Sequence, residues 1–431
     1  MSLPHMSGKV ISNINIEQVY LNLLDEDLPE DNYTNHNYVE PAEFSGGISL
    51  RNELNDILEE ISIEIDSRDE VSRKGKHLVV FKEHLEWFVM SLVANFFGRK
   101  YTVIQLQDCH YRNGSYLNMI GLRYTPIRVI SEALIELRYV EKLNYTNNPK
   151  TPKSTRLWPS KKLLDKVYKF NYLLTYRFNP PFVKLNKPID KDWVDTFREV
   201  LIDENHNDVR DMKIINDFLY QHEWANKGPL RLIYNVDAFH GGRLYTPFQN
   251  LRSRKVKERI NTLIDGERIC EVDYNANHLR LSLAIFSQQD AGDTPYEDIA
   301  KLCGETRSEI KMFITRCMGA ETKDSVLRSL IKDFESWDRK RFEKVLNAVH
   351  QRYPSLHMFG SVGVKLQSVE GSIIRKVILK GAHDKVVCLP IHDAIACKQS
   401  DLEWVVRVMK TMWREEVKGL ASPRIKILTS D

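Results

Sequence analysis

Residues 269–274 read Ile-Cys-Glu-Val-Asp-Tyr, and residues 387–393 read Val-Cys-Leu-Pro-Ile-His-Asp. Each segment is an apolar run with the length and β-branched content of a buried strand, and each contains an aspartate at its end. Two carboxylates brought together at strand ends can hold two Mg²⁺ ions. One ion activates an attacking 3′-hydroxyl and the other stabilises the leaving pyrophosphate. We therefore expect Asp273 and Asp393 to be metal ligands and catalytic residues rather than residues of surface turns.

A basic pair lies between the two aspartates in the sequence. Arg307 and Lys311 are four residues apart on a stretch with helical character, so both side chains can reach one triphosphate. Glu305 and Glu309 offer salt-bridge partners, so a solvated helix face is the alternative interpretation. The order of acid, basic pair and acid predicts a template-directed nucleotidyltransferase.

Several segments resemble the motifs of one polymerase family. Residues 271–280, Glu-Val-Asp-Tyr-Asn-Ala-Asn-His-Leu-Arg, resemble motif A of the family A DNA polymerases and of the related single-subunit phage-type RNA polymerases. Residues 390–394, Pro-Ile-His-Asp-Ala, resemble motif C, and residues 307–311 are similar to the Arg-x-x-x-Lys of motif B. Residues 242–250 are similar to the Gly-Arg-Leu…Leu-Gln-Asn segment that holds primer and template. The resemblance covers residues 230–415 and is closest to small, divergent members encoded by phages and mobile elements.

The resemblance implies a role for each matching residue. Asp273 and Asp393 would bind two Mg²⁺ ions, or Mn²⁺ in their place. The incoming dNTP, and to some extent an rNTP, would contact Arg307, Lys311, His278 and Tyr274. The DNA primer–template would contact Arg243, Gln249, Asn250, Gln367 and His392, together with a basic run that contains Arg252 and Arg254.

Three departures from the family pattern bear on nucleotide selection. His278 stands where motif A normally has the Glu that rejects a ribose 2′-hydroxyl, so we expect weak discrimination between sugars. Motif B ends early, at residues 317–319, without its aromatic residue, and Ala394 stands where a DNA polymerase usually has Glu. Two alternatives therefore stay open. One is a primase or primer-independent RNA polymerase of the same fold, and the other is a DNA-binding replication initiator or regulator that has lost catalysis.

The charge of the chain is unevenly distributed. The 431 residues carry a net charge of +3, but residues 1–70 contain 16 acidic and 3 basic side chains. The basic remainder suits a polyanionic partner through phosphate neutralisation. We interpret residues 1–47 as a flexible, solvated acidic leader rather than a cover for that surface. The six scattered cysteines, without a Cys-x-x-Cys pair, predict reduced thiols in a cytoplasmic protein, and no apolar run is long enough for a membrane span.

Residues 48–169 have the pattern of a helical domain that ends in a winged helix-turn-helix. A helix is expected to begin near Thr125 and Pro126, followed by a strand over 140–144, a basic loop over 145–154 and a second strand over 155–158. A packing module for protein contacts is the alternative. We expect DNA phosphates to contact the basic side chains of this region, which are Arg123, Arg128, Lys150, Lys153 and Arg156.

The remaining chain completes the predicted fold. Residues 170–229 are expected to form a thumb-like helical connector, with helices over 191–201 and 208–222, and residues 230–431 a polymerase palm with reduced fingers. No upstream tract carries the carboxylates of a proofreading exonuclease. The sequence therefore predicts an α+β right-hand polymerase core that follows a winged-helix domain. It does not specify the oligomeric state.

Overall fold

The fold was analysed in a computed structural model of the chain. It describes residues 15–29, 36–44, 47–112, 115–143, 155–178, 180–185, 207–234, 241–253, 257–419 and 421–430. Some sequence predictions lie outside these ranges, namely the basic loop over 145–154, the helix over 191–201 and the DNA contacts of Lys150, Lys153 and Arg254. Within the described residues, no helix is long and apolar enough to cross a membrane, and all six cysteines are free.

The acidic N-terminal segment is partly helical and packed, which corrects the expectation of a flexible leader. Helix α1 (Ile16–Leu24) begins at Asn15, whose side chain accepts a hydrogen bond from the backbone of Gln18. The apolar face of α1 is buried, and the hydroxyl of Tyr20 donates to Asp165 at 2.5 Å. Burying this face outweighs the acidic character of the segment, because the charged side chains stay on the solvent side.

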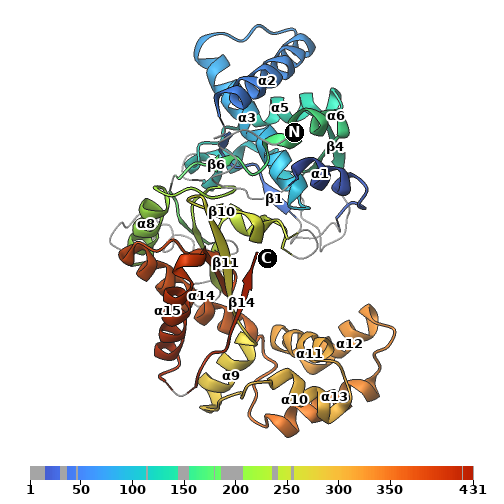
Figure 1. Ribbon diagram of the computed structural model, residues 1–431. Helices are drawn as coiled ribbons and strands as arrows, with labels where there is room; N and C mark the ends of the chain where they lie inside the picture. Colours follow the sequence, from blue (N-terminus) through green and yellow to red (C-terminus); the bar gives the residue numbers. More distant parts are fainter. Residues whose placement is uncertain are drawn as a thin grey trace.

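The N-terminal region is built around the long helix α3 (Gly75–Phe97), which packs against α2 (Ile48–Asp69). A four-stranded sheet lies beside α3, with the strand order β1 (His36–Tyr38), β3 (Tyr101–Ile104), β5 (Thr155–Pro159) and β4 (Val140–Leu143). The short helix α4 (Tyr116–Met119) and helix α5 (Tyr124–Glu136) lie between β3 and β4 in the chain. The region therefore runs helix, strand, two helices and two antiparallel strands, and Figure 1 shows it at the top.

A connecting region joins this part to the C-terminal half. It contains a three-stranded sheet of β7 (Val183–Leu185), β8 (Arg231–Tyr234) and β9 (Gly241–Tyr245), flanked by helix α8 (Asn207–Leu219). A second small sheet pairs β2 (Ala42–Phe44) with β6 (Leu174–Tyr176), and helix α6 (Lys161–Val167) precedes it. The carboxylate of Asp208 on α8 accepts from Tyr234 at 2.7 Å, so α8 is tied to the central strand β8.

The central sheet of the C-terminal half is antiparallel and carries the predicted site. Its path is β10 (Leu263–Ile264), β11 (Glu267–Tyr274), β13 (Ala394–Lys398) and β12 (Leu389–Ile391), while β14 (Ile425–Thr429) pairs with β11. Helices α14 (Val362–Asp384) and α15 (Leu402–Glu416) pack together against the sheet. Figure 1 shows β11 and β14 near the centre with α14 and α15 beside them. The mixed α+β fold class expected from the sequence is confirmed.

Two glycines allow α14 to lie directly on strand β9. A Cβ atom built on Gly371 of α14 would lie 2.1 Å from the carbonyl oxygen of Gly242, and Gly242 itself has φ +68°. Any side chain at 371 would therefore collide with backbone, and a non-glycine residue at 242 would be strained. This close approach brings the residue next to Gly371, which is Glu370, alongside Arg243 on β9.

A helical subdomain follows strand β11 in the chain. It consists of α9 (Asn277–Ser287), α10 (Pro295–Cys303), α11 (Arg307–Gly319), α12 (Lys323–Asp333) and α13 (Arg339–Arg352), and Figure 1 shows it at the lower right. Helix α11 starts with a capping box, in which Thr306 accepts from the backbone of Glu309 and the Glu309 carboxylate accepts from the backbone of Thr306. This cap fixes the first turn, which presents Arg307.

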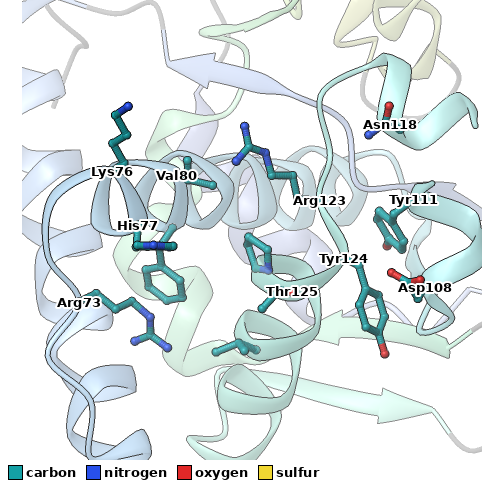
Figure 2. Close-up of a pocket in the computed structure, with 13 residues that line it drawn as sticks. Arg73, Lys76, His77, Val80, Asp108, Tyr111, Asn118, Arg123, Tyr124 and Thr125 are labelled. Atoms are coloured by element: carbon teal, nitrogen blue, oxygen red, sulfur yellow. The ribbon is translucent and has the colours of Figure 1, made fainter. Parts of the chain in front are cut away.

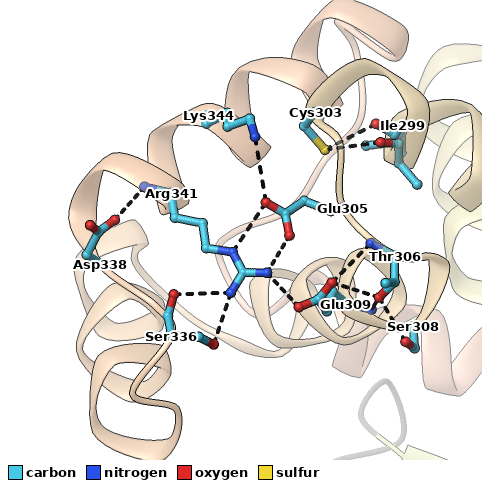
Figure 3. A network of polar contacts seen from close by, with 11 residues as sticks. Ile299, Cys303, Glu305, Thr306, Ser308, Glu309, Ser336, Asp338, Arg341 and Lys344 are labelled. Atoms are coloured by element: carbon cyan, nitrogen blue, oxygen red, sulfur yellow. Dashed lines mark hydrogen bonds and ion pairs between the residues drawn. The ribbon is translucent and has the colours of Figure 1, made fainter.

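One arginine holds the start of α11 against α13 (Figure 3). Arg341 of α13 donates to both oxygens of Glu305 and to Glu309 at 2.5 Å. The hydrogen bonds from Thr306 and then from Arg341 lower the pKa of Glu309 to about 2. Glu305 is only 8% exposed, so its charge needs compensation, which Arg341 supplies through two hydrogen bonds and Lys344 more weakly from 3.9 Å. The predicted salt-bridge role of Glu305 and Glu309 is thus filled by Arg341, and Arg307 is left to other partners.

We predict that Arg341→Met destabilises the protein by about 2 kcal/mol or more, because Glu305 would keep a mostly buried charge without its partner. Arg339→Met on the same helix is the matched control, since Arg339 is exposed and makes no ion pair among the described residues. Urea unfolding at pH 7 measures both variants. Equal stability of the two variants would contradict the anchoring role of Arg341.

Candidate active site at the central sheet

The two predicted aspartates meet at one end of the β11–β13 strand pair. Asp273 is the penultimate residue of β11, and its backbone is registered opposite Ala394, the first residue of β13. Asp393 immediately precedes Ala394 in the tight turn between β12 and β13. Antiparallel partners have Cβ atoms only about 5 Å apart, so this register places the two carboxylates in neighbouring positions. The sequence prediction that they meet is supported by the geometry.

The electrostatics of this pair depart from those of ordinary aspartates. Burial raises the pKa of Asp273 to about 6, and the positive charges of Lys311 and Lys426 partly offset this rise. Burial, followed by repulsion from Glu370 and Asp273, raises the pKa of Asp393 to about 7. Both carboxyls are therefore short of positive charge in a half-buried position. Perturbation of this kind is concentrated at functional sites, because cations or substrates supply the missing charge.

A third carboxylate, Glu370, organises the wall of the site. It is almost wholly buried on α14 and accepts two hydrogen bonds from Arg243, at 3.1 Å from Nε and 2.7 Å from Nη2. Its other oxygen lies 3.0 Å from His278 Nε2 and accepts from Asn277 at 3.3 Å. Burial alone would raise the pKa of Glu370, but His278 and Arg243 together lower it below its usual value. Glu370 therefore stays charged and joins β9, α9 and α14.

The basic pair of α11 faces the aspartates. Lys311 is exposed and close enough to Asp273 for its charge to lower the pKa of that carboxyl. Arg307, one turn earlier, is about half exposed, donates to Glu297 at 2.7 Å and lies 5.6 Å from the ring centroid of Tyr296. The two cations thus lie on the helix that borders the site. Their predicted contact with a triphosphate stays a prediction.

Tyr274 is not available to a nucleotide, which corrects its predicted role. It is 3% exposed, and its hydroxyl donates to the carbonyl of Met409 on α15 at 2.7 Å. Successive residues of a strand point to opposite faces of the sheet. With Asp273 directed to the site, its neighbour Tyr274 is directed into the core beneath α15.

Three residues of the predicted nucleic-acid contact, Gln249, Asn250 and Arg252, follow strand β9. Gln249 and Asn250 form part of a short 3₁₀ turn (Pro247–Asn250), and Asn250 Oδ1 accepts from Lys100 at 2.9 Å. Arg252 is mostly buried and pairs with Glu26 at 2.8 Å, so the acidic N-terminal segment does contact part of the basic surface. Glu26 also lies 3.3 Å from Arg99. This contact corrects the expectation that the leader only extends into solvent.

The two remaining residues of the predicted primer contact lie beside the aspartates. His392 has φ +58° and is exposed in the turn that carries Asp393. Gln367 is half-buried on α14, three residues before Glu370 and therefore on a similar face of the helix. The residue of this helix that contacts Arg243 is Glu370 and not Gln367.

In the N-terminal region, two predicted phosphate contacts have different outcomes. Arg156 is 1% exposed within β5, so it faces the core and not a phosphate, which corrects its prediction. The residues of β5 from Arg156 to Pro159 are all buried, so both faces of this inner strand are covered. Arg128 is 43% exposed on α5 and lies 3.5 Å from Glu132, so its predicted contact with DNA stays a prediction.

Three residues near the site were not predicted from the sequence. They are Glu370, Lys426 and Tyr296. Lys426 on β14 lies opposite Asp273 in the strand register. Burial raises the pKa of Tyr296, which the charges of Arg307 and Asp393 also affect. The helical spacing from Gln367 was a usable signal for Glu370. Lys426 and Tyr296 come from β14 and α10, and only the folded chain brings these elements to the aspartates.

The donor set for a metal is small. No group of three or more His, Cys, Asp and Glu side chains within the described ranges is arranged to hold a metal ion. Asp273 and Asp393 provide two carboxylates. Two carboxylates suit Mg²⁺, which commonly keeps its waters and takes further oxygens from substrate phosphates. The strand register places the two carboxylates in neighbouring positions, so the residues fit a bound cation.

Comparisons with known proteins give a likeness among solved structures. No family model and no curated protein matches the sequence. Among solved structures, the chain is similar to the POL domain of Pol1 from M. smegmatis in complex with DNA primer-template and dNTP. The identity is 12% and the TM-score 0.37, and the match covers 97% of this chain and 79% of that chain. At this TM-score the likeness does not by itself establish a shared fold.

We predict that Asp273→Asn stabilises the metal-free protein at neutral pH. The folded pKa of Asp273 is about 6 against an ordinary 3.8, so the folded state holds its proton to higher pH. The protonated Asp273 therefore contributes its full stabilisation below pH 4. This contribution to the free energy of unfolding, about 3 kcal/mol, is lost as the pH rises through 6.

Urea unfolding in EDTA measures this effect at pH 4 and pH 8. The free energy of unfolding of Asp273→Asn is expected to be higher than that of the wild type at pH 8 and equal to it at pH 4. The same is expected for Asp393→Asn. Asp324→Asn, at an exposed position on α12, serves as the control. A gain that is the same at both pH values would show that burial and repulsion do not act on Asp273.

Proposed function

We propose that the protein is a template-directed nucleotidyltransferase that adds nucleotides to a 3′-hydroxyl. The observation that carries this proposal is the strand register, which brings Asp273 and Asp393 together with pKa values of about 6 and 7. Two adjacent, half-buried carboxylates with a lysine beside them are suited to metal-assisted phosphoryl transfer. The motif resemblance to family A polymerases agrees with this chemistry.

Asp273 and Asp393 would hold two Mg²⁺ ions. When bound, these ions would lower the pKa of the attacking hydroxyl and neutralise charge on the leaving pyrophosphate. The protein itself would position the triphosphate with Lys311 and Arg307, which stand at the start of α11 on the same side of the helix. The capping box and Arg341 keep this helix start in place, so binding requires little rearrangement.

Nucleic acid would lie against the wall of the site. Arg243 is held by Glu370, with part of its side chain exposed, and Gln367 and His392 are close to the same surface. The N-terminal region would contact duplex DNA as a winged helix, with α5 as recognition helix and β4 and β5 as the wing. Arg128 is the exposed cation on α5 for this contact.

The sugar of the incoming nucleotide would be selected near His278. Its imidazole lies 3.0 Å from Glu370, so a carboxylate is present here although it comes from α14 and not from motif A. A histidine held in this way can accept or donate to a hydroxyl, which favours some use of rNTPs. This observation supports the second candidate, a primase or RNA polymerase of the same fold.

We predict that Asp273→Asn or Asp393→Asn lowers nucleotide incorporation by about a thousandfold, because each removes a metal ligand worth several kcal/mol of transition-state stabilisation. Primer extension with labelled dNTPs and rNTPs, with and without template and with Mg²⁺, measures this activity. Asp324→Asn is the matched control and should retain full activity. Near wild-type incorporation by either aspartate variant, or no incorporation by the wild type, would refute the proposed activity.

We predict that the preference between dNTPs and rNTPs depends on which of positions 278 and 370 carries the histidine and which carries the glutamate. His278→Glu alone would place two carboxylates about 3 Å apart and should destabilise the protein. The exchange variant His278→Glu with Glu370→His should recover much of this stability and shift incorporation toward dNTPs. The measurement is the ratio of dNTP to rNTP incorporation, together with thermal unfolding. Strict selection of dNTPs by the wild type would contradict a permissive His278.

A further inference from the structure

A cavity in the N-terminal region lies far from the motifs of the proposed active site in the sequence. It has a volume of about 800 Å³ and opens between helix α3 and the start of α5 (Figure 2). Its lining residues come from α3, from the 3₁₀ turn Asp108–Tyr111 and from α5. This volume lies within the range of pockets that hold small organic ligands. The arrangement of its side chains indicates which ligand chemistry it fits.

Basic side chains line one side of the cavity and its middle. Figure 2 shows Lys76 and His77 on one side and Arg123 between them and Tyr124, and all three basic side chains are exposed. Within the part of the chain that the structure describes, no ion pair joins these side chains to an acidic residue. Unpaired cations from two separate helical segments that face one cavity favour an anionic ligand. The nearby Arg73 is different, because its guanidinium lies 4.0 Å from the ring centroid of Phe81 and pairs with Asp69 at 2.8 Å.

A buried histidine sets the position of Arg123. His84 is 1% exposed, and its Nδ1 lies 2.8 Å from the carbonyl of Val80, which it can only contact as a donor. Its Nε2 therefore accepts from the backbone N–H of Arg123 at 3.1 Å. Burial lowers the pKa of His84, which keeps this neutral form at physiological pH. Arg123 is thus held at the cavity entrance by a contact that uses its backbone and leaves its guanidinium available.

The other side of the cavity has a different character. Figure 2 shows Asp108, Tyr111 and Tyr124 together there, away from Lys76 and His77. The two tyrosine rings have centroids 5.7 Å apart, and their hydroxyls donate to backbone carbonyls, that of Tyr111 at 2.9 Å and that of Tyr124 at 3.3 Å. The rings therefore present fixed aromatic surface. Asp108 is exposed and lies 3.3 Å from Arg112, so it can also accept a hydrogen bond from a ligand.

We propose that this cavity binds a nucleotide that bears a terminal phosphate. The phosphate would contact Lys76, Arg123 and His77, while the base would lie against Tyr124 with its amino group toward Asp108. Cations on one side and in the middle, and an aromatic surface with a carboxylate on the other side, match the two halves of a nucleotide. The ligand source is either a free nucleoside triphosphate or the phosphorylated 5′ end of a strand. The site does not depend on the proposed nucleotidyl transfer.

Fluorescence titration with a labelled ATP analogue in EDTA tests this site, because the proposed palm site needs a divalent cation. The wild type should bind the analogue, and ATP or a 5′-phosphorylated trinucleotide should displace it. The unphosphorylated trinucleotide and adenosine should not. Displacement by ATP alone would identify the free nucleotide as ligand, and displacement by the phosphorylated trinucleotide as well would identify a strand end. Displacement by inorganic triphosphate as effectively as by ATP would overturn the proposal, because the base would then contribute nothing.

Matched variants separate the cavity from the proposed active site. Lys76→Ala and Arg123→Ala should each weaken binding on the order of tenfold, since each removes a charge-assisted contact. Val80→Trp, which fills the cavity without changing charge, should also weaken it. Lys332→Ala, at an exposed position of helix α12, is the control and should bind as the wild type does. No binding by the wild type, or equal binding by the cavity variants, would overturn the proposal whatever the primer-extension result.

Discussion

The proposed chemistry depends on the repulsion between two carboxylates that a strand register forces together. The pairing of Asp273 with Ala394 leaves Asp393 no position away from Asp273, and burial removes much of the water that would screen them. The protein tolerates this cost through the charges of Lys311 and Lys426 and through a raised pKa for each carboxyl. A bound cation would relieve the same repulsion. The destabilised pair and the proposed activity therefore have one physical origin.

The surrounding structure keeps further charges near this pair in fixed positions. Glu370 adds a third negative charge, but Arg243 and His278 satisfy it, so it stays ionised although it is buried. The contact exists because Gly371 lets α14 touch the backbone of β9 at Gly242. A larger residue at 371 would separate the helix from the strand, and a side chain at 242 would collide with the ring of Tyr234. The contact between Gly371 and Gly242 thus determines where Arg243, and any nucleic-acid strand bound to it, can lie.

The helix that carries the basic pair is positioned by a separate network. Glu309 closes the capping box of α11 and accepts from Arg341, so the first turn of α11 is bound both locally and to α13. This leaves Lys311 to face Asp273 and Arg307 to contact Glu297. In the N-terminal region, His84 has a comparable effect on Arg123. In both places a mostly buried polar contact fixes an exposed cation, which reduces the entropy lost when an anion binds.

The sequence alone determined the two strands that carry Asp273 and Asp393, because apolar runs of strand length that end near Asp are a local pattern. It also determined the helical stretch that carries Arg307 and Lys311, and the free thiols. The tertiary structure decided which neighbours those residues have. Tyr274 and Arg156 face the core because of the side on which α15 and the N-terminal core pack, and Arg243 contacts a glutamate 127 residues away. Such contacts depend on the packing of distant elements, which no local periodicity encodes.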